Sequence, residues 1–178
     1  NDLYDGEVCD GRVDITRYAQ PDFCPQAEGW PKAAESPAPG GVLRASRIQP
    51  IRITKTLEPV SIKHISKYRC IVDFGQNFAG WTRLKMKGLP DKRITLKHGE
   101  VLNQAGWVST DNLRDARAVD NYVLKGGEYE IYQPRFTYHG FRYVEILAEE
   151  PLEEFEITGC AVNSDVEQTG CFSCGNEL

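Results

Sequence analysis

Four charged side chains near the N-terminus have types and spacing that could bind a cation or a sugar. They are Asp5, Glu7, Asp10 and Arg12. In an extended segment, side chains two residues apart point to the same side, so Asp5 and Glu7 would present their oxygens together. Carboxylate oxygens placed in this way suit Ca²⁺ or paired hydroxyl groups. The alternative is a strand end where solvated carboxylates form ordinary surface ion pairs.

A second group of polar and aromatic side chains occupies residues 73–81, which read Asp-Phe-Gly-Gln-Asn-Phe-Ala-Gly-Trp. An aromatic ring can cover the apolar face of a sugar, and amides or a carboxylate can bind its hydroxyls. The glycines permit positive φ angles and a tight change of direction. The same residues also suit a strand–turn–strand corner whose aromatic rings enter the core and whose amides hold the turn. The composition favours this corner.

Two weaker candidates lie further along the chain. His98 and Glu100 are two residues apart on an expected strand, so their side chains share a face, which is the spacing of a general acid–base pair. A hydrogen bond at a strand end is the ordinary explanation. An acidic group consists of Asp111, Asn112, Asp115 and Asp120. It lacks the D-x-D-x-D-G spacing of a calcium-binding loop, so we interpret it as a solvated turn beside a short helix within residues 111–119. Residues 136–143 are expected to place their aromatic rings in the core around a tight turn.

The six cysteines do not define a metal or redox site. Their even number permits disulfides, but their spacing is irregular and a domain of this size does not need them. Cys171 and Cys174 form one C-x-x-C pair. A structural zinc site needs four ligands, commonly from two such pairs, and the sequence has no second pair. We therefore expect a plain pair of thiols.

Composition and charge narrow the class of protein. A chain of 178 residues with 40% hydrophobic residues can form one domain with a real core. Asp and Glu outnumber Lys and Arg by 26 to 21, and no dense basic run is interleaved with aromatics, which argues against nucleic acid as a partner. No apolar stretch approaches the roughly 20 residues that a membrane span requires. Because the chain begins at Asn1 without Met, we expect a piece of a longer protein, and its localisation is left open.

The elements that must position these side chains are mainly strands. Apolar and polar residues alternate at residues 51–54, 81–86, 94–97, 141–146 and 155–158. Short β-branched or aromatic runs, which fit central strands, occur at residues 70–72 and 122–124. Turn residues separate several of them, as in Gly126-Gly127. Many short strands with polar, glycine-rich turns are typical of a β-sandwich. The proline-rich segment 21–41 is expected to be an irregular surface excursion.

Several motifs, taken in order, resemble one family. The opening residues 4–12 are similar to a "Y-x-G-E-x-Y-D-A-R" pattern, with Cys9 in place of Tyr and Gly11 in place of Ala. The later motifs are residues 93–100, Leu102, and residues 113–117, 120–126 and 134–144. Together they resemble the β-domain that precedes the catalytic barrel in bacterial α-L-rhamnosidases of glycoside hydrolase family 78. The resemblance covers nearly the whole chain.

The resemblance implies an all-β fold of the jelly-roll β-sandwich type. We expect this domain to span residues 1–163, with residues 164–178 forming a linker towards the barrel. In that family the barrel carries the two carboxylates that protonate the leaving oxygen and activate water, about 6.5–9.5 Å apart in an inverting enzyme. The chain shows none of the barrel, so we predict that it has no catalytic residues of its own.

A calcium-dependent rhamnose-binding module is known within this architecture. By resemblance its site is built around an Asp in the first motif, which is Asp5 here, and the Pro before a strand, which is Pro50. Tyr18 stands where the family has a Gly-Trp, and Gly6 follows Asp5 where the family often has Asn. The predicted carbohydrate site is therefore Asp5, Glu7, Tyr18 and Pro50, with Asp5 as the calcium ligand. Trp30 is expected to pack in the core.

Two functions follow from this resemblance. In the first, the domain buttresses its own catalytic barrel and binds no sugar alone. In the second, it is an accessory module that binds rhamnose-containing glycans with calcium. The loss of the aromatic part of the module's site favours the first function.

Overall fold

The computed structural model describes residues 1–13, 16–27 and 29–175. Its regular elements are nine strands and two short 3-10 helices: β1 (Val8–Asp10), η1 (Thr16–Ala19), β2 (Ile51–Leu57), β3 (Ser61–Ser66), β4 (Arg69–Met86), β5 (Arg93–Gly99), η2 (Asp111–Leu113), β6 (Val119–Val123), β7 (Glu130–Tyr132), β8 (His139–Ala148) and β9 (Phe155–Ser164). The described residues contain no α-helix, so the all-β prediction is confirmed.

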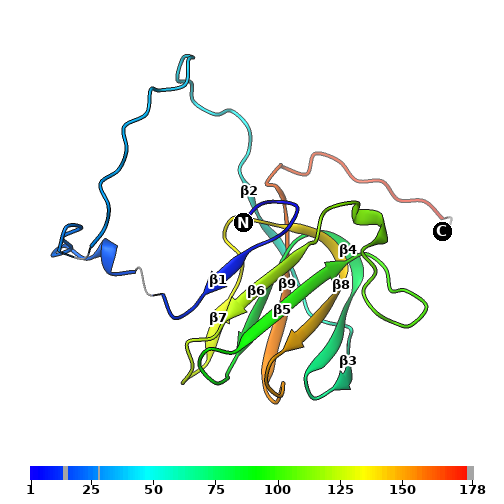
Figure 1. The fold of residues 1–178 in the computed structure, drawn as a ribbon. Coiled ribbons are helices and arrows are strands. Elements are labelled where there is room, and N and C mark those ends of the chain that lie inside the picture. The colour runs from blue at the N-terminus through cyan, green and yellow to red at the C-terminus, as the bar shows by residue number, and fades with distance from the viewer. Residues whose placement is uncertain (14–15, 28, 176–178) are drawn as a thin grey trace.

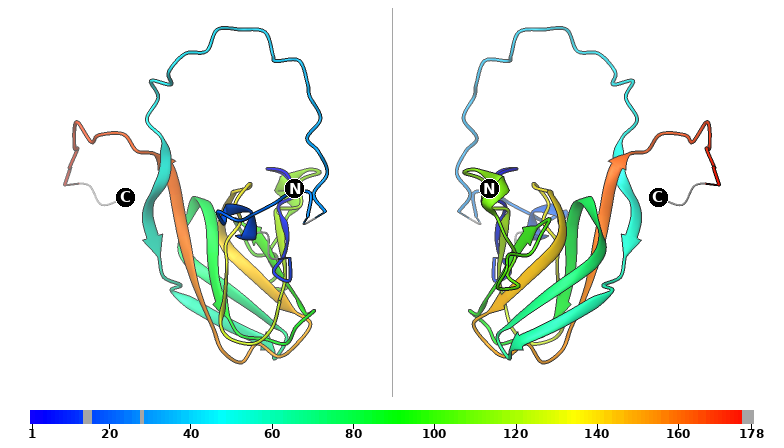
Figure 2. Two further views of the ribbon diagram at one scale, coloured as in Figure 1. Left: turned by 90° about the vertical axis from the view of Figure 1, so that its left-hand side faces the viewer. Right: turned by 90° about the vertical axis from the view of Figure 1, so that its right-hand side faces the viewer.

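The strands form one continuous hydrogen-bonded sheet in the order β1-β6-β5-β8-β4-β9-β2, with β3 and β7 also paired to β4. All pairs are antiparallel except β1 with β6. The sheet curls strongly, so that β2 and β9 face β5 and β6 across the interior (Figures 1 and 2). The result is two packed layers that share the long strand β4.

Strand β4 holds the two layers together, and it corrects the expected corner at residues 73–81. The chain does not turn back there. It continues as one strand whose register with β8 shifts between Asp73 and Phe78, which is a β-bulge. Gly75 takes a φ of 76° inside the bulge, a conformation that side chains with a Cβ rarely adopt. The bulge lets the first half of β4 pair with β3 and the second half with β7 and β9.

The core lies between the two layers of the curled sheet. Its fully buried side chains include Val72, Leu84, Ile94, Leu96, Leu124, Phe141, Val144 and Ile146. Phe74, Phe78 and Phe141 form a cluster of ring contacts, with centroids 4.4 to 5.9 Å apart. The rings of Phe74 and Phe78 thus enter the core, as the corner interpretation required, whereas Trp81 is half-buried. Burial of these alternating side chains is what selects strands over other structure.

Several local expectations were wrong. Only Asp111–Leu113 of the expected helix at 111–119 is helical, as one 3-10 turn. Of the aromatic residues in 136–143, Phe141 is buried but Phe136 and Tyr138 are exposed. Trp30 is also exposed, and its ring packs edge-to-face against Phe23 at 5.5 Å rather than in the core. Aromatic type alone therefore did not identify which rings the sheet covers.

The segments outside the sheet are irregular. Between η1 and β2 the described residues form turns and extended chain that runs away from the strands (Figure 1), which confirms the irregular excursion predicted for 21–41. After β9 ends at Ser164, residues 165–175 form neither helix nor strand. No helix within the described ranges is both long and apolar enough to cross a membrane.

Candidate functional site

The N-terminal turn fixes the backbone around Asp5. The carboxylate of Asp2 accepts hydrogen bonds from the backbone N–H groups of Asp5 at 2.6 Å and Tyr4 at 2.8 Å, and these bonds hold the pKa of Asp2 below its ordinary value. Gly6 has a φ of 101°, and a Cβ there would collide with the carbonyl oxygen of Val119. Glycine is therefore required directly after Asp5 in this chain.

The side chain of Asp5 projects from this turn into solvent. It is 51% exposed, and one carboxylate oxygen lies 3.9 Å from Nε of Arg117. Its backbone carbonyl accepts a hydrogen bond from Val119 N–H at 3.1 Å, so the turn is fastened to β6. An exposed ion pair at this distance contributes little to stability, and the carboxylate of Asp5 retains free acceptor positions.

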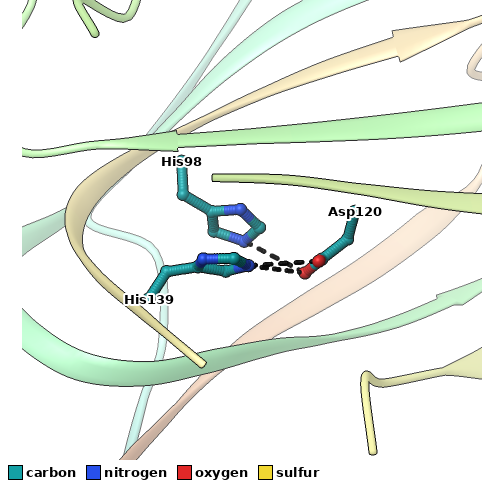
Figure 3. Close-up of side chains that lie close together, drawn as sticks. All are labelled: His98, Asp120 and His139. Carbon is teal, nitrogen blue, oxygen red and sulfur yellow. Dashed lines mark hydrogen bonds and ion pairs between the residues drawn. The ribbon is translucent and has the colours of Figure 1, made fainter. Parts of the chain in front are cut away.

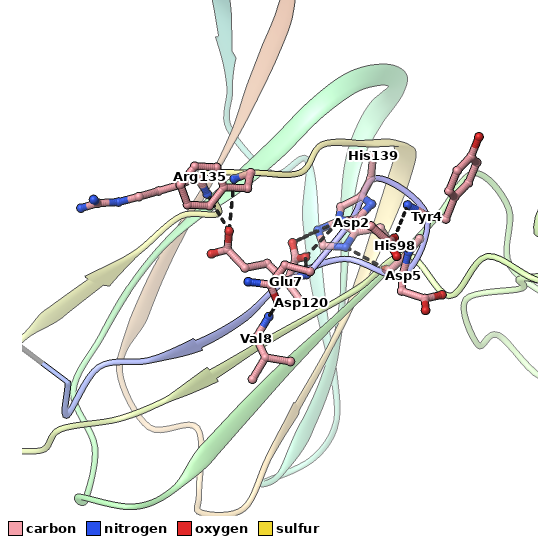
Figure 4. A network of polar contacts seen from close by, with 12 residues as sticks. Asp2, Tyr4, Asp5, Glu7, Val8, His98, Asp120, Arg135 and His139 are labelled. Carbon is pink, nitrogen blue, oxygen red and sulfur yellow. Dashed lines mark hydrogen bonds and ion pairs between the residues drawn. The ribbon is translucent and has the colours of Figure 1, made fainter. Parts of the chain in front are cut away.

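Glu7, in contrast, points inward. Its side chain is buried, and Oε2 accepts hydrogen bonds from the backbone N–H groups of Arg135 at 3.0 Å and Phe136 at 3.2 Å. The hydroxyl of Tyr132 lies 3.5 Å from Oε1. The carboxylate thus anchors the loop before β8 to the N-terminal segment (Figure 4). Asp5 and Glu7 do not present their oxygens to one side as the extended pattern predicted.

Asp120 connects this anchor to a buried cluster. The backbone N–H of Glu7 donates to Oδ1 of Asp120 at 3.0 Å. The same carboxylate lies 3.1 and 3.2 Å from Nε2 of His139. His98 completes the cluster, with its Nε2 3.9 Å from Oδ2 of Asp120 (Figure 3). The three side chains come from neighbouring strands, β6, β8 and β5, and all are buried.

The geometry of the two histidines is well defined. Their rings are stacked, with centroids 4.3 Å apart and planes inclined by 26°, and Phe141 packs edge-on against His98. Nδ1 of His98 lies 3.1 Å from the carbonyl oxygen of Ala118. Both Nε2 atoms therefore face the carboxylate of Asp120 (Figure 3).

The electrostatics of this cluster follow from burial. Burial and the neighbouring His139 lower the pKa of His98 to about 3, so its ring is neutral at ordinary pH. Burial alone would raise the pKa of Asp120, but the hydrogen bond from His139 and the interactions with His98 outweigh it, and the pKa lies below its ordinary value. The cluster thus holds an ionised carboxylate between two imidazoles.

The four predicted sugar-binding residues lie on separate elements of the structure. Asp5 precedes β1 and Pro50 precedes β2, and these strands lie at opposite ends of the sheet order (Figure 2). The backbone carbonyl of Pro50 accepts a hydrogen bond from Asp165 N–H at 3.0 Å. Tyr18 is 58% exposed on η1, at the start of the excursion. No contact joins Asp5, Tyr18 and Pro50 among the described residues.

The other sequence candidates have structural partners. Asp73 forms a two-pronged ion pair with Arg142, at 2.8 and 2.9 Å, and also accepts the N–H of Gly75 at 2.6 Å. The oxygens of Glu100 accept hydrogen bonds from the side chains of Asn77 at 2.8 Å and Asn112 at 2.9 Å. Neither carboxylate lies in a cleft opposite a second one, so neither has the arrangement of a glycosidase pair.

The buried cluster was missed in the sequence. His98, Asp120 and His139 are far apart in the chain and follow no spacing motif, and Asp120 was grouped with the acidic turn. A local signal did exist for two of them, because His98 takes the alternate position after Leu96 and Asp120 takes the alternate position before Tyr122. In both places a polar residue stands where the strand pattern is otherwise apolar. Only the adjacency of β6, β5 and β8 places the three side chains in one spot.

Two family descriptions match this chain. The bacterial alpha-L-rhamnosidase concanavalin-like domain matches residues 63–163, and the alpha-L-rhamnosidase N-terminal domain matches residues 1–55. A concanavalin-like domain is a β-sandwich, which confirms that part of the predicted fold class. The jelly-roll connectivity stays a prediction.

Curated relatives and solved structures agree with these matches. An α-L-rhamnosidase of Streptomyces avermitilis is 39% identical over 145 residues, which are 82% of this chain and 14% of that protein. An α-L-rhamnosidase structure from Dictyoglumus thermophilum superposes with a TM-score of 0.90 at 40% identity, covering 99% of this chain and 20% of that one. The structure of the Streptomyces avermitilis enzyme complexed with L-rhamnose has a TM-score of 0.82 at 36% identity, covering 92% of this chain and 16% of that one.

The chain thus spans about a fifth or less of the length of these relatives. It aligns with them along nearly all of its own length at 36–40% identity, and the strands, the N-terminal turn and the loops between them fall within the matched residues. Since the concanavalin-like match alone accounts for more than half of its residues, the chain belongs to the bacterial α-L-rhamnosidase family.

Proposed function

We propose that this chain is a non-catalytic β-sandwich domain that buttresses the catalytic barrel of an α-L-rhamnosidase. The observation that carries the proposal is how three buried carboxylates are used. Glu7, Glu130 and Glu150 are buried and accept hydrogen bonds from backbone N–H groups of loops. Carboxylates committed in this way hold loops in place and are not available as a general acid and base.

Exposed apolar side chains on β2 and β3 support the buttressing role. Ile51 and Ile53 of β2 are 70% and 46% exposed, and Ile62 and Ile65 of β3 are also exposed. β2 ends the sheet order, so within the described residues one edge of it has no strand beside it. Apolar side chains on such an edge are costly to leave in water and typical of a surface that another part of a protein covers. The proposed cover is the protein's own catalytic barrel.

The activity test uses the purified chain and an aryl α-L-rhamnoside. The expected result is no release of the aryl group above the buffer blank. Turnover that persists through purification, and that disappears in Glu100→Gln or Asp73→Asn, would refute the non-catalytic assignment. The relatives share the name α-L-rhamnosidase, so a full-length protein containing this chain is expected to release the aryl group under the same conditions.

The buttress itself is tested in such a full-length protein. Ile53→Lys should lower the temperature at which rhamnosidase activity is lost, because a charge would be buried under the barrel. Val42→Lys is the matched control, because Val42 is an exposed apolar residue of the excursion. Equal thermal inactivation of the two variants would mean that the barrel does not cover β2.

A second proposal is that the domain binds rhamnose with calcium around Asp5. The favouring observation is that the Asp5 carboxylate is half exposed and weakly paired, while its backbone is rigidly held. Because Asp5 stands apart from Tyr18 and Pro50, and Glu7 is occupied, such a site would rest on few contacts. Each protein–sugar hydrogen bond contributes only about 0.5–1.5 kcal/mol, so the expected affinity is roughly millimolar.

Titration calorimetry with L-rhamnose, with and without Ca²⁺, distinguishes the two proposals. If the second holds, heat appears only with calcium and is lost in Asp5→Ala, while Asp73→Ala affects only folding. The absence of heat under both conditions leaves the buttress as the function. We keep residues 164–178 as a proposed linker to the barrel under either function.

A further inference from the structure

The buried cluster of His98, Asp120 and His139 serves neither proposed function. One ligand-type atom from each side chain lies within 4.8 Å of the others. The three side chains are 0–2% exposed, so no glycan or bulk solvent reaches them. They come from three adjacent strands, and nothing in their backbone pairing requires polar side chains at these positions.

The hydrogen-bond partners fix the tautomer of His98. A backbone carbonyl oxygen can only accept, so the contact from Nδ1 of His98 to Ala118 at 3.1 Å requires a hydrogen on Nδ1. In the neutral ring, Nε2 then carries a lone pair. This Nε2 has no hydrogen-bond partner although it is buried. A buried acceptor without a donor is costly, and native structures rarely leave one in that state.

The lone pair of His98 is directed at other electron-rich atoms. Oδ2 of Asp120 lies 3.9 Å away. Nε2 of His139 lies within 3.2 Å of both oxygens of the same carboxylate, but a single N–H can satisfy only one of them well. The acceptor atoms of His98 and Asp120 thus converge on one point beside Nε2 of His139, which becomes a third acceptor once its hydrogen moves to Nδ1 (Figure 3). A positive centre at that point would satisfy all of them.

We propose that His98 Nε2, His139 Nε2 and the Asp120 carboxylate bind a Zn²⁺ ion. Two imidazoles and a carboxylate that binds through both of its oxygens supply the four donor atoms of a closed zinc site, whereas calcium requires six to eight oxygens. Zinc–nitrogen bonds of about 2.0–2.1 Å place tetrahedral ligand atoms roughly 3.3 Å apart. The separations in the structure start at 3.1 Å and are at most 4.8 Å, so the widest pair needs to close by at most about 1.5 Å. On binding, the hydrogen of His139 resides on Nδ1.

The surroundings already supply the outer contacts that orient zinc ligands. A zinc-binding histidine usually donates its other ring N–H to a carbonyl or carboxylate, as His98 does to Ala118. The ligating carboxylate is itself held, here by the backbone N–H of Glu7 at 3.0 Å. The ion would tie β5, β6 and β8 together and, through Glu7, would also support the N-terminal turn.

The test starts from the whole chain unfolded in a chelator and refolded with or without one equivalent of Zn²⁺. The expected result is one zinc per chain after gel filtration and an unfolding temperature higher by roughly 5–10 °C with the ion. Because the cluster is buried, zinc added to the folded, metal-free chain should enter slowly, and a chelator should remove it slowly. Co²⁺ in place of zinc should give the visible absorption bands of a tetrahedral site.

Variants locate the ion. Asp120→Asn and His98→Gln should each lower zinc affinity at least tenfold and abolish the cobalt bands. His64→Gln is the matched control, because His64 is exposed on β3, and Cys171→Ser with Cys174→Ser tests the C-x-x-C pair. Both controls should bind zinc as the unaltered chain does.

Two results would overturn the proposal, and neither depends on whether the cluster variants fold. One is an unaltered chain that refolds with zinc present but retains none and unfolds at an unchanged temperature. The other is zinc binding that disappears in the Cys171→Ser, Cys174→Ser variant or in His64→Gln. Either outcome would leave the cluster as a hydrogen-bonded network held by the proton on His139.

Discussion

Replacing Glu7 by alanine tests whether this carboxylate is structural. The change removes the acceptor for the backbone N–H groups of Arg135 and Phe136. A backbone donor left without a partner costs about 1–3 kcal/mol when it is buried, so two such donors cost about 2–6 kcal/mol. Water can reach this loop, since Arg135 and Phe136 have exposed side chains, and we therefore expect a loss of about 2–4 kcal/mol in the free energy of unfolding.

Glu7→Gln is the matched variant. Its amide oxygen can still accept the two backbone N–H groups, while its NH₂ group can donate to the hydroxyl of Tyr132, which now lies 3.5 Å from Oε1. The variant loses only the extra strength of hydrogen bonds to a charged acceptor, so we expect a loss of about 1–2 kcal/mol. Urea denaturation followed by tryptophan fluorescence measures both values.

The essential result is that Glu7→Ala loses more free energy of unfolding than Glu7→Gln does. A loss below about 0.5 kcal/mol for Glu7→Ala, within the range of ordinary surface substitutions, would mean that the loop before β8 does not depend on Glu7. In that case its carboxylate would be free for a ligand, and the sugar-binding role predicted for Glu7 would regain support.

Three further predictions concern the rest of the sheet. Gly80→Ala should destabilise the domain by at least about 2 kcal/mol, because Gly80 has a φ of 157° and a Cβ there would collide with a carbonyl of β9. Gly140→Ala, which has open space around it, should change the free energy of unfolding by less than about 1 kcal/mol. Thermal unfolding measures both. The ion pair with Arg142 lowers the pKa of Asp73, so the pair stabilises the fold fully above the ordinary pKa of about 3.9, and this stability is lost as pH falls through the lower native pKa. Arg142→Gln should therefore flatten the acid limb of the free energy of unfolding plotted against pH. An unchanged acid limb would refute this prediction. Burial raises the pKa of Cys70 to about 12, so this thiol should react with iodoacetamide only after unfolding, as peptide mass mapping would show.

Strands with one buried face could be predicted from the sequence. Residues 94–97 and 155–158 alternate because β5 and β9 each cover the core with every second side chain. β3 was missed because both of its faces are exposed, so Ile62 and Lys63 follow no burial pattern. The corner expected at 73–81 is a bulge instead, since the pairing of β4 with strands far along the chain keeps it extended.

The candidate sites were harder to predict, because they depend on which strands are neighbours. Resemblance suggested that Asp5 and Pro50 meet, but β1 and β2 lie at opposite ends of the sheet order. Conversely, His98 and His139 looked isolated in the sequence and are stacked in the structure. Periodicity determines which face a side chain occupies, and it does not determine strand order.

The position of β1 and β2 in the sheet has a consequence for biosynthesis. Both strands belong to the N-terminal part of the chain, yet β1 pairs with β6 and β2 pairs with β9, the last of the described strands to be synthesised. During translation the apolar residues of β2 therefore remain without their partner until the whole domain has emerged. An unpaired strand edge of this kind favours aggregation, so the nascent chain is expected to depend on chaperones until β9 is complete.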